Sequence, residues 1–341
     1  MRITSPTILS LSALCTMFAC DSASPSTTTD PDASEHAQLD ARLDSNGGNT
    51  PDAKPNTAIK HVFVILMENH SWSSIKGSSS APYINSLLTK GAHAENYKTP
   101  PANHPSEANY IWLEAGGNMG VTDDNDPSSH HFAATDHLTT QLTAAGFTWK
   151  AYAEDINGSA CPLTSTGLYG VKHTPQLFFD DVTDNNSKTS ANCIAHVRPY
   201  TELASDLTAN RVANYNFITP NLCNDMHGDL NGCIPGLVNT VRRGDDWLKA
   251  QVPKLLASQA YADHGAIFIL WDEGDEPLGQ TASDGPMGMI VLSANAKLGY
   301  SNNIAYDHSS TVRTMQDIFG LRPYLRGAAN AQSLLDLFTS L

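Results

Sequence analysis

Two pairs of polar residues follow two strongly apolar segments, and their side chains could together bind a metal ion. Glu68 and Asn69 come directly after HVFVILM, and Asp272 and Glu273 come directly after GAIFILW. Three carboxylates brought together in a buried place repel one another by several kcal/mol unless a cation lies among them. Either pair alone is better explained by a solvated polar loop at a sheet edge. Both pairs together, at matching strand ends, predict a divalent metal site.

A serine with the features of a nucleophile lies in the segment TPPANHPSEANYIW. Its two adjacent prolines force an extended chain, and a helical pattern begins close to Ser106. A serine at this place is most often a helix cap. Beside a metal ion it could instead act as a nucleophile, because the ion lowers the pKa of the hydroxyl and the helix amides receive an anion. A carboxylate-rich metal site near Ser106 favours phosphoryl or sulfuryl transfer.

Alternating strands and helices must position these residues. Apolar runs typical of buried strands occur at 61–67, 147–153, 213–218, 265–271 and 287–292. Helical spacing occurs between them, at 82–90, 106–115, 136–145, 237–257, 309–319 and 331–339. This alternation predicts an α/β fold, a three-layer α/β/α sandwich with a mostly parallel central sheet. In such sheets functional groups gather beyond the carboxyl ends of the strands.

Further polar residues are expected at the same edge of the sheet. Asp225 and His227, in TPNLCNDMHGD, follow another strand, and His227 could protonate a leaving alcohol while Asp225 orients it. His308, in YDHSS, precedes a helix and could face an anion. His173, in YGVKHTP, is a candidate for binding the substrate's charge. Considered singly, each histidine is more typical of a surface residue than of a catalyst.

The remaining groups of potential metal ligands are interpreted as structural. Cys161, Cys193, Cys223 and Cys233 allow three disulfide pairings, of which the sequence-local Cys161–Cys193 and Cys223–Cys233 are favoured. A zinc site is the competing interpretation, but the sequence has no C-x-x-C spacing. The segment SSHHFAATDH, with His130, His131 and His137, resembles a metal-binding tract, but it is interpreted as a loop and a helix start, with metal binding as the alternative.

Composition limits the classes of function. The chain has 341 residues, of which 40% are hydrophobic and 16% are charged, so it can bury a sizeable core. Its formal net charge of −15 argues against nucleic acid as a partner, because no basic patch stands out. The same charge would be repelled by anionic lipid, so membrane attachment must come from a separate segment.

That segment is predicted at the N-terminus. Residues 1–20 resemble a bacterial secretion signal that ends at a lipoprotein-type cysteine, Cys20, which would carry a lipid anchor; an ordinary cleaved signal is the alternative. Residues 21–58 are rich in Ser, Thr, Asp and Pro and are expected to form a disordered linker. Residues 59–341 are then the catalytic domain. The expected location is the bacterial cell envelope, periplasmic or surface, or the secreted fraction.

Seven segments in this order resemble a known family. They are ILMENHSW, APYINSLL, HPSEANYIWLEAG, TWKAYAED, PNLCNDMHG, WDEGD and YDHSSTVRTMQDIFGL. They resemble the bacterial phosphoesterase family of acid phosphatases and phosphocholine-type phospholipases C, which is related to the alkaline phosphatase superfamily. The resemblance covers about residues 60–325.

The resemblance implies a role for each matching position. The implied metal ligands are Glu68, Asn69, Ser106, Asp272 and Glu273. Ser106 is implied as the nucleophile and Asn109 as a contact to a phosphate oxygen. Related members read His-Pro-Ser-Leu-Pro-Asn-Tyr, whereas this chain has Glu107 and Ala108 in the middle of that motif. Members of the wider superfamily often bind two zinc ions, and Asp225, His227 and His308 could supply a second site, but the members most similar to this chain use one metal.

The sequence therefore predicts a metal-dependent hydrolase of phosphoric esters that acts through a phosphoserine. A phosphomonoesterase of the acid phosphatase type is favoured over a phospholipase C-type phosphodiesterase, because no apolar amphipathic stretch stands out for a lipid interface. A sulfatase is disfavoured by the lack of Cys-x-Pro-x-Arg, and a serine esterase by the lack of G-x-S-x-G. A non-catalytic surface lipoprotein that binds a ligand is the alternative from another class. Oxygen ligands suit Mg²⁺, Ca²⁺ or Mn²⁺ at least as well as Zn²⁺, and the sequence leaves the ion and the oligomeric state open.

Overall fold

A sheet of eight strands lies at the centre of the computed structural model, which describes residues 59–230, 232–275 and 284–340. The strand order is β4-β3-β5-β1-β6-β7-β2-β8. The strands are β1 His61–Met67, β2 Ala92–Ala94, β3 Trp149–Ala153, β4 Val197–Pro199, β5 Tyr215–Thr219, β6 Gly265–Trp271, β7 Met289–Ser293 and β8 Ser301–Asn302. The expected signal at 1–20, with Cys20, and the linker at 21–58 lie outside the described residues.

The sheet is mostly parallel, as the sequence predicts. Strands β4, β3, β5, β1 and β6 pair in parallel, and β2 and β8 also pair in parallel. β7 is antiparallel to both of its neighbours, β6 and β2. All five strands expected from apolar runs are present, and the strands that the sequence analysis missed, β2, β4 and β8, are only two or three residues long.

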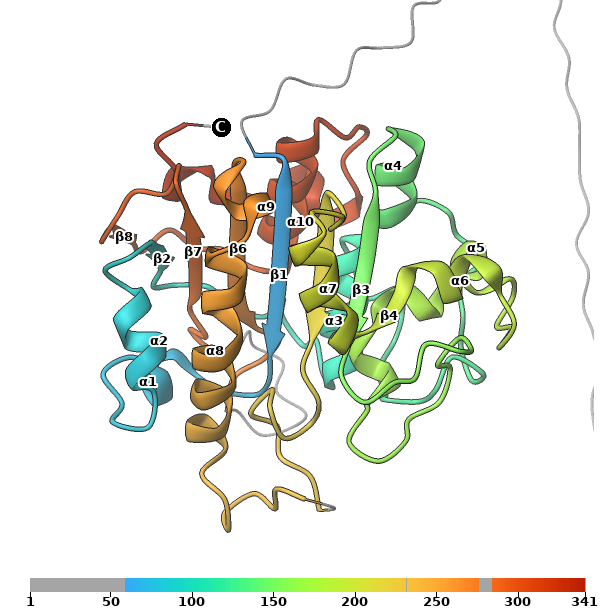
Figure 1. The fold of residues 1–341 in the computed structure, drawn as a ribbon, viewed down its shortest axis with the longest axis horizontal. Helices are drawn as coiled ribbons and strands as arrows, with labels where there is room; N and C mark the ends of the chain where they lie inside the picture. Colours follow the sequence, from blue (N-terminus) through green and yellow to red (C-terminus); the bar gives the residue numbers. More distant parts are fainter. Residues whose placement is uncertain (1–58, 231, 276–283, 341) are drawn as a thin grey trace, which may run out of the picture. The chain divides into compact units, whose positions relative to one another are not determined.

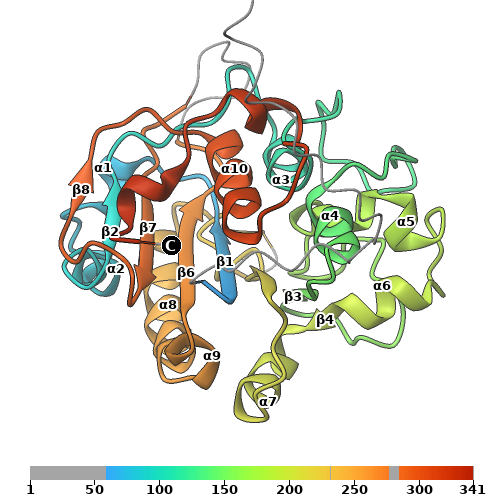
Figure 2. The same ribbon diagram turned by 90° about the horizontal axis from the view of Figure 1, so that it is seen from above.

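Helices cover both faces of the sheet and complete the three-layer sandwich (Figures 1 and 2). Helices α2 and α8 pack together, and α3, α4 and α10 pack together on the other face. The helices are α1 Trp72–Ile75, α2 Pro82–Leu87, α3 Ser106–Ala115, α4 Leu138–Ala144, α5 Asp180–Thr183, α6 Ala191–His196, α7 Leu203–Thr208, α8 Thr240–Leu256, α9 Gln259–Ala262 and α10 His308–Phe319.

The prediction of a helix at 331–339 is wrong. The chain forms only a 3-10 turn there, η5 Leu334–Leu337. Phe338 is extended, with φ −110° and ψ 154°, and it forms an antiparallel bridge with Ala296. This pairing holds the chain in an extended conformation where the apolar spacing indicates a further helical turn.

The register between β1 and β6 fixes the geometry of the site. Their partners run from His61 opposite Gly265 to Met67 opposite Trp271, so both strands end at the same level. The N–H of Asp272 donates to the carbonyl oxygen of Met67 at 3.0 Å. The residues that follow the two strands therefore leave the sheet side by side.

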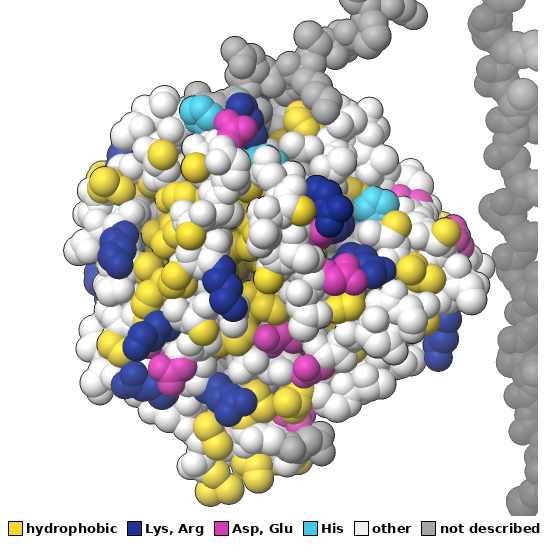
Figure 3. Space-filling model, viewed as in Figure 1, with side chains coloured by type: hydrophobic (Ala, Val, Ile, Leu, Met, Phe, Trp, Pro, Cys, Tyr) yellow, Lys and Arg dark blue, Asp and Glu magenta, His cyan; other side chains and the backbone are white. Residues whose placement is uncertain are grey.

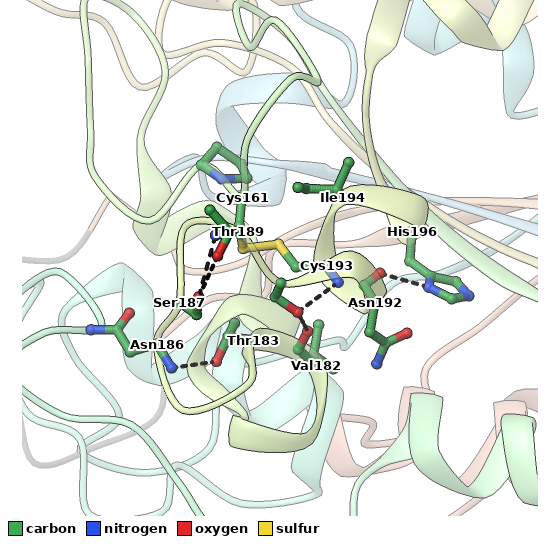
Figure 4. The surroundings of a disulfide bond; sticks show 12 residues. Cys161, Val182, Thr183, Asn186, Ser187, Thr189, Asn192, Cys193, Ile194 and His196 are labelled. Carbon is green, nitrogen blue, oxygen red and sulfur yellow. Dashed lines mark hydrogen bonds between the residues drawn. A yellow bond between two sulfur atoms is a disulfide. The ribbon is translucent and has the colours of Figure 1, made fainter.

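Both favoured disulfides are present. Cys161 is bonded to Cys193, 32 positions further along the chain, and Figure 4 shows the turns around this bond. Cys223 is bonded to Cys233 and closes a short loop after β5. In the part of the chain that the structure describes, no helix has the length and apolar character needed to span a membrane.

Candidate active site

Three carboxylates from three adjacent strands meet at the carboxyl edge of the sheet. Glu68 follows β1, Asp272 follows β6 and Asp225 lies in the loop after β5, and all three are fully buried. The N–H of Glu68 donates to the carbonyl oxygen of Asp225 at 2.8 Å. The N–H of Asn69 donates to Oδ1 of Asp272 at 3.1 Å. These two hydrogen bonds hold the three segments together.

Burial and mutual repulsion make these carboxyls hold protons strongly. Burial raises the pKa of Glu68 to about 7, and the charge of Glu273 adds to this, although His227 and Lys172 oppose it. Burial, followed by the charge of Glu68, raises the pKa of Asp272 well above its usual range. The same two causes raise the pKa of Asp225. A cation among these groups would remove the penalty that their charges impose on one another.

Four buried oxygen atoms at this place accept no hydrogen bond within the described residues, although two of them have a ring nitrogen of His173 beside them, at 3.0 and 3.4 Å. They are Glu68 Oε1, Asn69 Oδ1, Asp225 Oδ2 and Asp272 Oδ2. Buried polar atoms in folded proteins are nearly always satisfied, so such a group of oxygens needs a partner of another kind. Carboxylate and amide oxygens are the ligands that hard divalent cations prefer. The donor set therefore fits a divalent metal ion.

The backbone at two of these positions is held in an unusual conformation. Asn69 has a φ of 44°, and Met226, between Asp225 and His227, has a φ of 86°. Residues other than glycine rarely adopt positive φ, and such residues concentrate at functional sites. Gly244 in α8 makes room for this loop, because a Cβ there would lie 2.3 Å from Cγ of Met226.

Ser106 is the first residue of α3 and is not its cap. The N-cap is Pro105, which makes no side-chain cap hydrogen bond. The Ser106 side chain is buried, and its Oγ donates to Oε2 of Glu68 at 3.0 Å. The neighbouring amides already have acceptors, since the N–H of Glu107 donates to Asp124 Oδ1 and that of Ala108 to the Pro105 carbonyl oxygen.

His173 lies deeper than the sequence analysis expects of a substrate-binding residue. Its side chain is fully buried, and its ring stacks on Tyr110 with the ring centroids 4.6 Å apart. Its Nε2 lies 3.0 Å from Glu68 Oε1, and its Nδ1 lies 3.4 Å from Asp225 Oδ2. Burial, followed by the positive charges of Lys172 and His227, holds its pKa well below the usual range. Glu68, His173 and Asp225 form a group with the spacing of metal ligands.

His227 is less enclosed than His173 and His308, which are both fully buried. It is half-buried, and the centroid of its ring lies 6.3 Å from that of His173. The backbone N–H of His227 donates to Asp225 Oδ1. The ring nitrogen Nδ1 of His227 contacts the carbonyl oxygen of Gly228 at 2.6 Å. Asp225 therefore orients the backbone of His227, and Nδ1 carries the proton that it gives to the carbonyl.

Asn109 and His308 are both enclosed by protein groups. The Asn109 amide nitrogen donates to Glu273 Oε2 and to the carbonyl oxygen of Asn103, each at 3.0 Å. His308 Nε2 donates to the carbonyl oxygen of Asp272 at 2.7 Å and to Asn109 Oδ1 at 3.1 Å. Its Nδ1 lies 2.9 Å from the Tyr97 hydroxyl, and burial lowers its pKa to about 3. Both ring nitrogens of His308 therefore contact protein groups. This arrangement differs from the anion-facing position expected from the sequence.

Glu273 is paired with a histidine that the sequence analysis missed. His104 Nδ1 lies 2.8 Å from Glu273 Oε2, and its Nε2 lies 3.0 Å from Asp284 Oδ2. Contact with Glu273, reinforced by the charge of Asp284, raises the pKa of His104 to about 9 against the effect of burial. His104 therefore neutralises one of the acids expected to bind metal. The position of His104, two residues before Ser106, is the sequence feature that could have indicated it as a residue of the site.

Comparison with known proteins identifies relatives of this chain. The model of the Phosphoesterase family matches residues 77–322. The phosphatidylinositol-3-phosphatase of Mycobacterium tuberculosis is 28% identical over 278 residues, which cover 82% of this chain and 82% of that protein. A probable acid phosphatase of Kluyveromyces lactis is 25% identical over 226 residues, covering 64% of this chain and 48% of that protein. This chain thus spans about half the length of the fungal relative.

A solved structure supports the assignment of the fold. A protein of the alkaline phosphatase superfamily from Vibrio parahaemolyticus has a TM-score of 0.50 to this chain, with 9% identity. The superposition covers 85% of this chain and 77% of that one. The alkaline phosphatase-like fold expected from the sequence is confirmed, and at this identity the likeness concerns the fold alone.

Replacing Glu68 or Asp272 by alanine should remove the bound metal ion and the turnover of a phosphate ester together, because each supplies charge that the cation needs. Elemental analysis of dialysed protein measures the first effect. Asp275→Ala is the matched control, since Asp275 is an exposed carboxylate a few residues from the site. Unchanged metal content in both site variants would show that the ion does not bind at these strand ends.

The affinity for the metal ion should fall as the pH is lowered from 8 to 5.5. Protons compete with the cation for carboxyls whose pKa is raised, to about 7 for Glu68. Isothermal titration with Mg²⁺ or Mn²⁺ across this range measures the effect. An affinity that stays constant over the range would contradict the shared buried carboxylate site.

Proposed function

Because the chain belongs to the phosphoesterase family and is a phosphoric ester hydrolase, we propose that it is a phosphomonoesterase of the acid phosphatase type with Ser106 as its nucleophile. One observation carries the proposal. The buried Ser106 hydroxyl donates to Glu68 beside a group of unpartnered oxygens that fits a divalent cation. The names of the fungal and mycobacterial relatives, a probable acid phosphatase and a phosphatidylinositol-3-phosphatase, support a phosphate ester as the substrate.

The residues proposed to hold the ion are Glu68, Asn69, Asp272 and Ser106, with Asp225 and His173 close enough to complete the set. Glu273 is a weaker ligand than the sequence analysis expects, because its Oε2 is engaged by His104 and Asn109. A bound divalent ion would supply Lewis-acid stabilisation of negative charge on the phosphoryl oxygens and favour the ionised serine. The ion remains one of Mg²⁺, Ca²⁺, Mn²⁺ or Zn²⁺.

The proposed reaction has two steps. Ser106 Oγ attacks phosphorus, its proton is accepted by Glu68 Oε2, and the bond from phosphorus to the leaving oxygen breaks. His227, protonated at Nε2, gives that proton to the leaving alcohol. Water then attacks the phosphoserine, His227 accepts a proton from it, and the Oγ–P bond breaks to release phosphate. Ser106 recovers its proton from Glu68.

Other residues position this machinery. His308 holds the carbonyl of Asp272 and the amide of Asn109, so we assign it a positioning role in place of the catalytic role expected from the sequence. Asn109 holds Glu273 in turn. Lys172, which forms an ion pair with Asp124 at 2.8 Å, adds positive charge near Glu68.

We also propose that the protein is exported, with Cys20 carrying a lipid anchor. The two disulfides support an oxidising compartment, where such bonds persist. Mass spectrometry of the mature N-terminus tests the anchor directly. An unacylated residue 20 in membrane fractions would contradict it.

A second candidate is a phosphorylated lipid as the substrate, and it is favoured by an exposed apolar tip on the loop that carries Asp225 and His227. Leu230 is 79% exposed and Leu237 is 80% exposed, with the half-exposed Ile234 and Val238 beside them. Figure 3 shows apolar side chains at the lower end of the view, where Figure 1 places the loop between β5 and α8. No periodic pattern in the sequence indicates this surface, because the tip is short and irregular.

Ser106→Ala should lower turnover by several orders of magnitude, because the covalent route is lost. It should keep the fold, since loss of one hydrogen bond costs about 0.5–1.5 kcal/mol. Acid quenching of the wild-type protein during turnover, followed by phosphopeptide mapping, should place the phosphate on Ser106. Label on another residue, or near wild-type turnover of the variant, would exclude Ser106 as the nucleophile. Ser309→Ala, at a buried serine in the first turn of α10, is the matched control.

Replacing Leu230 and Leu237 by serine should lower turnover on phosphatidylinositol phosphate in vesicles by about tenfold or more, and leave turnover of a soluble aryl phosphate unchanged. Insertion of each leucine into the lipid contributes about 1.5–3 kcal/mol to membrane binding. Leu298→Ser is the control, because Leu298 is 71% exposed but follows β7, which ends at the opposite edge of the sheet. Equal losses on both substrates would assign the tip to folding or catalysis, and no loss on either would exclude a lipid-facing role.

A further inference from the structure

Three potential metal ligands gather at a place that the proposed reaction does not use. Glu107 is the second residue of α3, and Asp123 and His130 lie in the segment between α3 and α4. One ligand atom from each lies within 4.8 Å of the others. His130 Nε2 contacts Glu107 Oε1, and His130 Nδ1 lies 3.7 Å from Asp123 Oδ1.

The group is separate from the cluster around Glu68 although Glu107 follows Ser106 in the sequence. Successive side chains of a helix point about 100° apart. The Ser106 hydroxyl contacts Glu68, whereas the Glu107 carboxylate contacts His130 on the segment beyond α3. The two sites share a helix start but no side chain.

An unsatisfied buried oxygen indicates that a partner is missing at this group. The Glu107 side chain is fully buried, and its Oε2 receives no hydrogen bond within residues 59–230, 232–275 and 284–340. Its surroundings are acidic, because Asp123 and Asp124 are its neighbours. The nearby cation Lys172 is directed at Asp124 Oδ2, 2.8 Å away. A buried carboxylate in such a field is costly unless it is paired or coordinates a metal ion.

The donor set indicates which ion would fit. One imidazole nitrogen and two carboxylate oxygens suit Zn²⁺, a borderline ion, and also Mn²⁺, which prefers oxygen ligands. His130 and Asp123 are partly exposed, with side chains 23% and 51% accessible, so water can complete the coordination and an ion can enter. We propose that Glu107, Asp123 and His130 form a second metal site that takes such an ion.

A cation at this site would fasten the segment after α3 to the start of the helix. Asp124 Oδ1 already accepts the N–H of Glu107 at 3.0 Å, so one hydrogen bond makes the same connection. Ser106 precedes Glu107 directly, and its placement against Glu68 depends on how the first turn of α3 is held. Ion binding at this site does not depend on the proposed reaction.

The test counts metal ions in the full chain. Protein stripped with chelator is reloaded with Zn²⁺ or Mn²⁺, dialysed and analysed for metal per chain. The Asp123→Asn and His130→Gln double variant should lose one ion relative to wild type, while Asp272→Ala should lose a different one. His131→Gln is the matched control, because His131 is the adjacent histidine and lies 2.5 Å from Asp180 instead.

The combined variant, with all three substitutions, should lose both ions. Thermal unfolding supplies a second measurement, since added Zn²⁺ should raise the Tm of Asp272→Ala but raise that of the combined variant by less. A double variant that keeps the wild-type ion count would overturn the proposal and leave Glu107 and His130 as an ion pair only. Loss of an equal count in His131→Gln would also overturn it, because the ion would then be bound by the histidine segment in general.

Discussion

The in-register parallel pairing of β1 with β6 is the constraint from which the site follows. Both strands are buried, and they end at Met67 and Trp271, which are partners in the register. Their next residues, Glu68 and Asp272, are thereby forced into the same buried volume. A shift of one residue would turn either side chain to the other face of the sheet. The strand pairing itself therefore brings the two acids close enough to repel each other. The surrounding groups have to compensate for this repulsion.

The histidines around this volume divide into charged and neutral ones, and burial together with acidic contacts explains the division. His104 lies between Glu273 and Asp284, and these acids raise its pKa to about 9. Burial keeps His173 and His308 neutral, so their ring nitrogens can act as acceptors or as directed donors. The positive charge of His104 lies at one edge of the acidic group. Within the part of the chain that the structure describes, Glu68, Asp225 and Asp272 have no cationic side chain in direct contact.

The nucleophile proposed here is placed by contacts from several parts of the chain. Glu68 receives the Ser106 hydroxyl, and Asp124 holds the amide of the next residue. Both contacts act on the first turn of α3, where neither Pro105 nor Ser106 supplies a conventional cap. The helix start is therefore fixed by tertiary contacts. Its position is sensitive to the charge state of acids on two sides, those of the strand ends and those of the segment after α3.

The sequence by itself determined the architecture and the identity of the central acids. Continuous apolar runs predicted β1 and β6 to the residue, and polar pairs after them indicated that Glu68 and Asp272 would meet, because parallel strands end at one edge. Sequence-local spacing also predicted the disulfides Cys161–Cys193 and Cys223–Cys233.

Only the tertiary structure decided which of the remaining polar residues face the acids. His173 ends the 3-10 helix η1 Val171–His173 and His104 lies on an irregular segment. Neither stretch is long enough for periodicity to predict a direction, and both side chains prove to be buried against carboxylates. His308 lies at the predicted helix start, but its ring is turned to the carbonyl of Asp272 by packing that the local sequence does not encode. Contact between Glu107 and His130 joins residues 23 positions apart. Strand ends are set by local hydrophobicity, whereas side-chain partners across loops are set by how the whole chain packs.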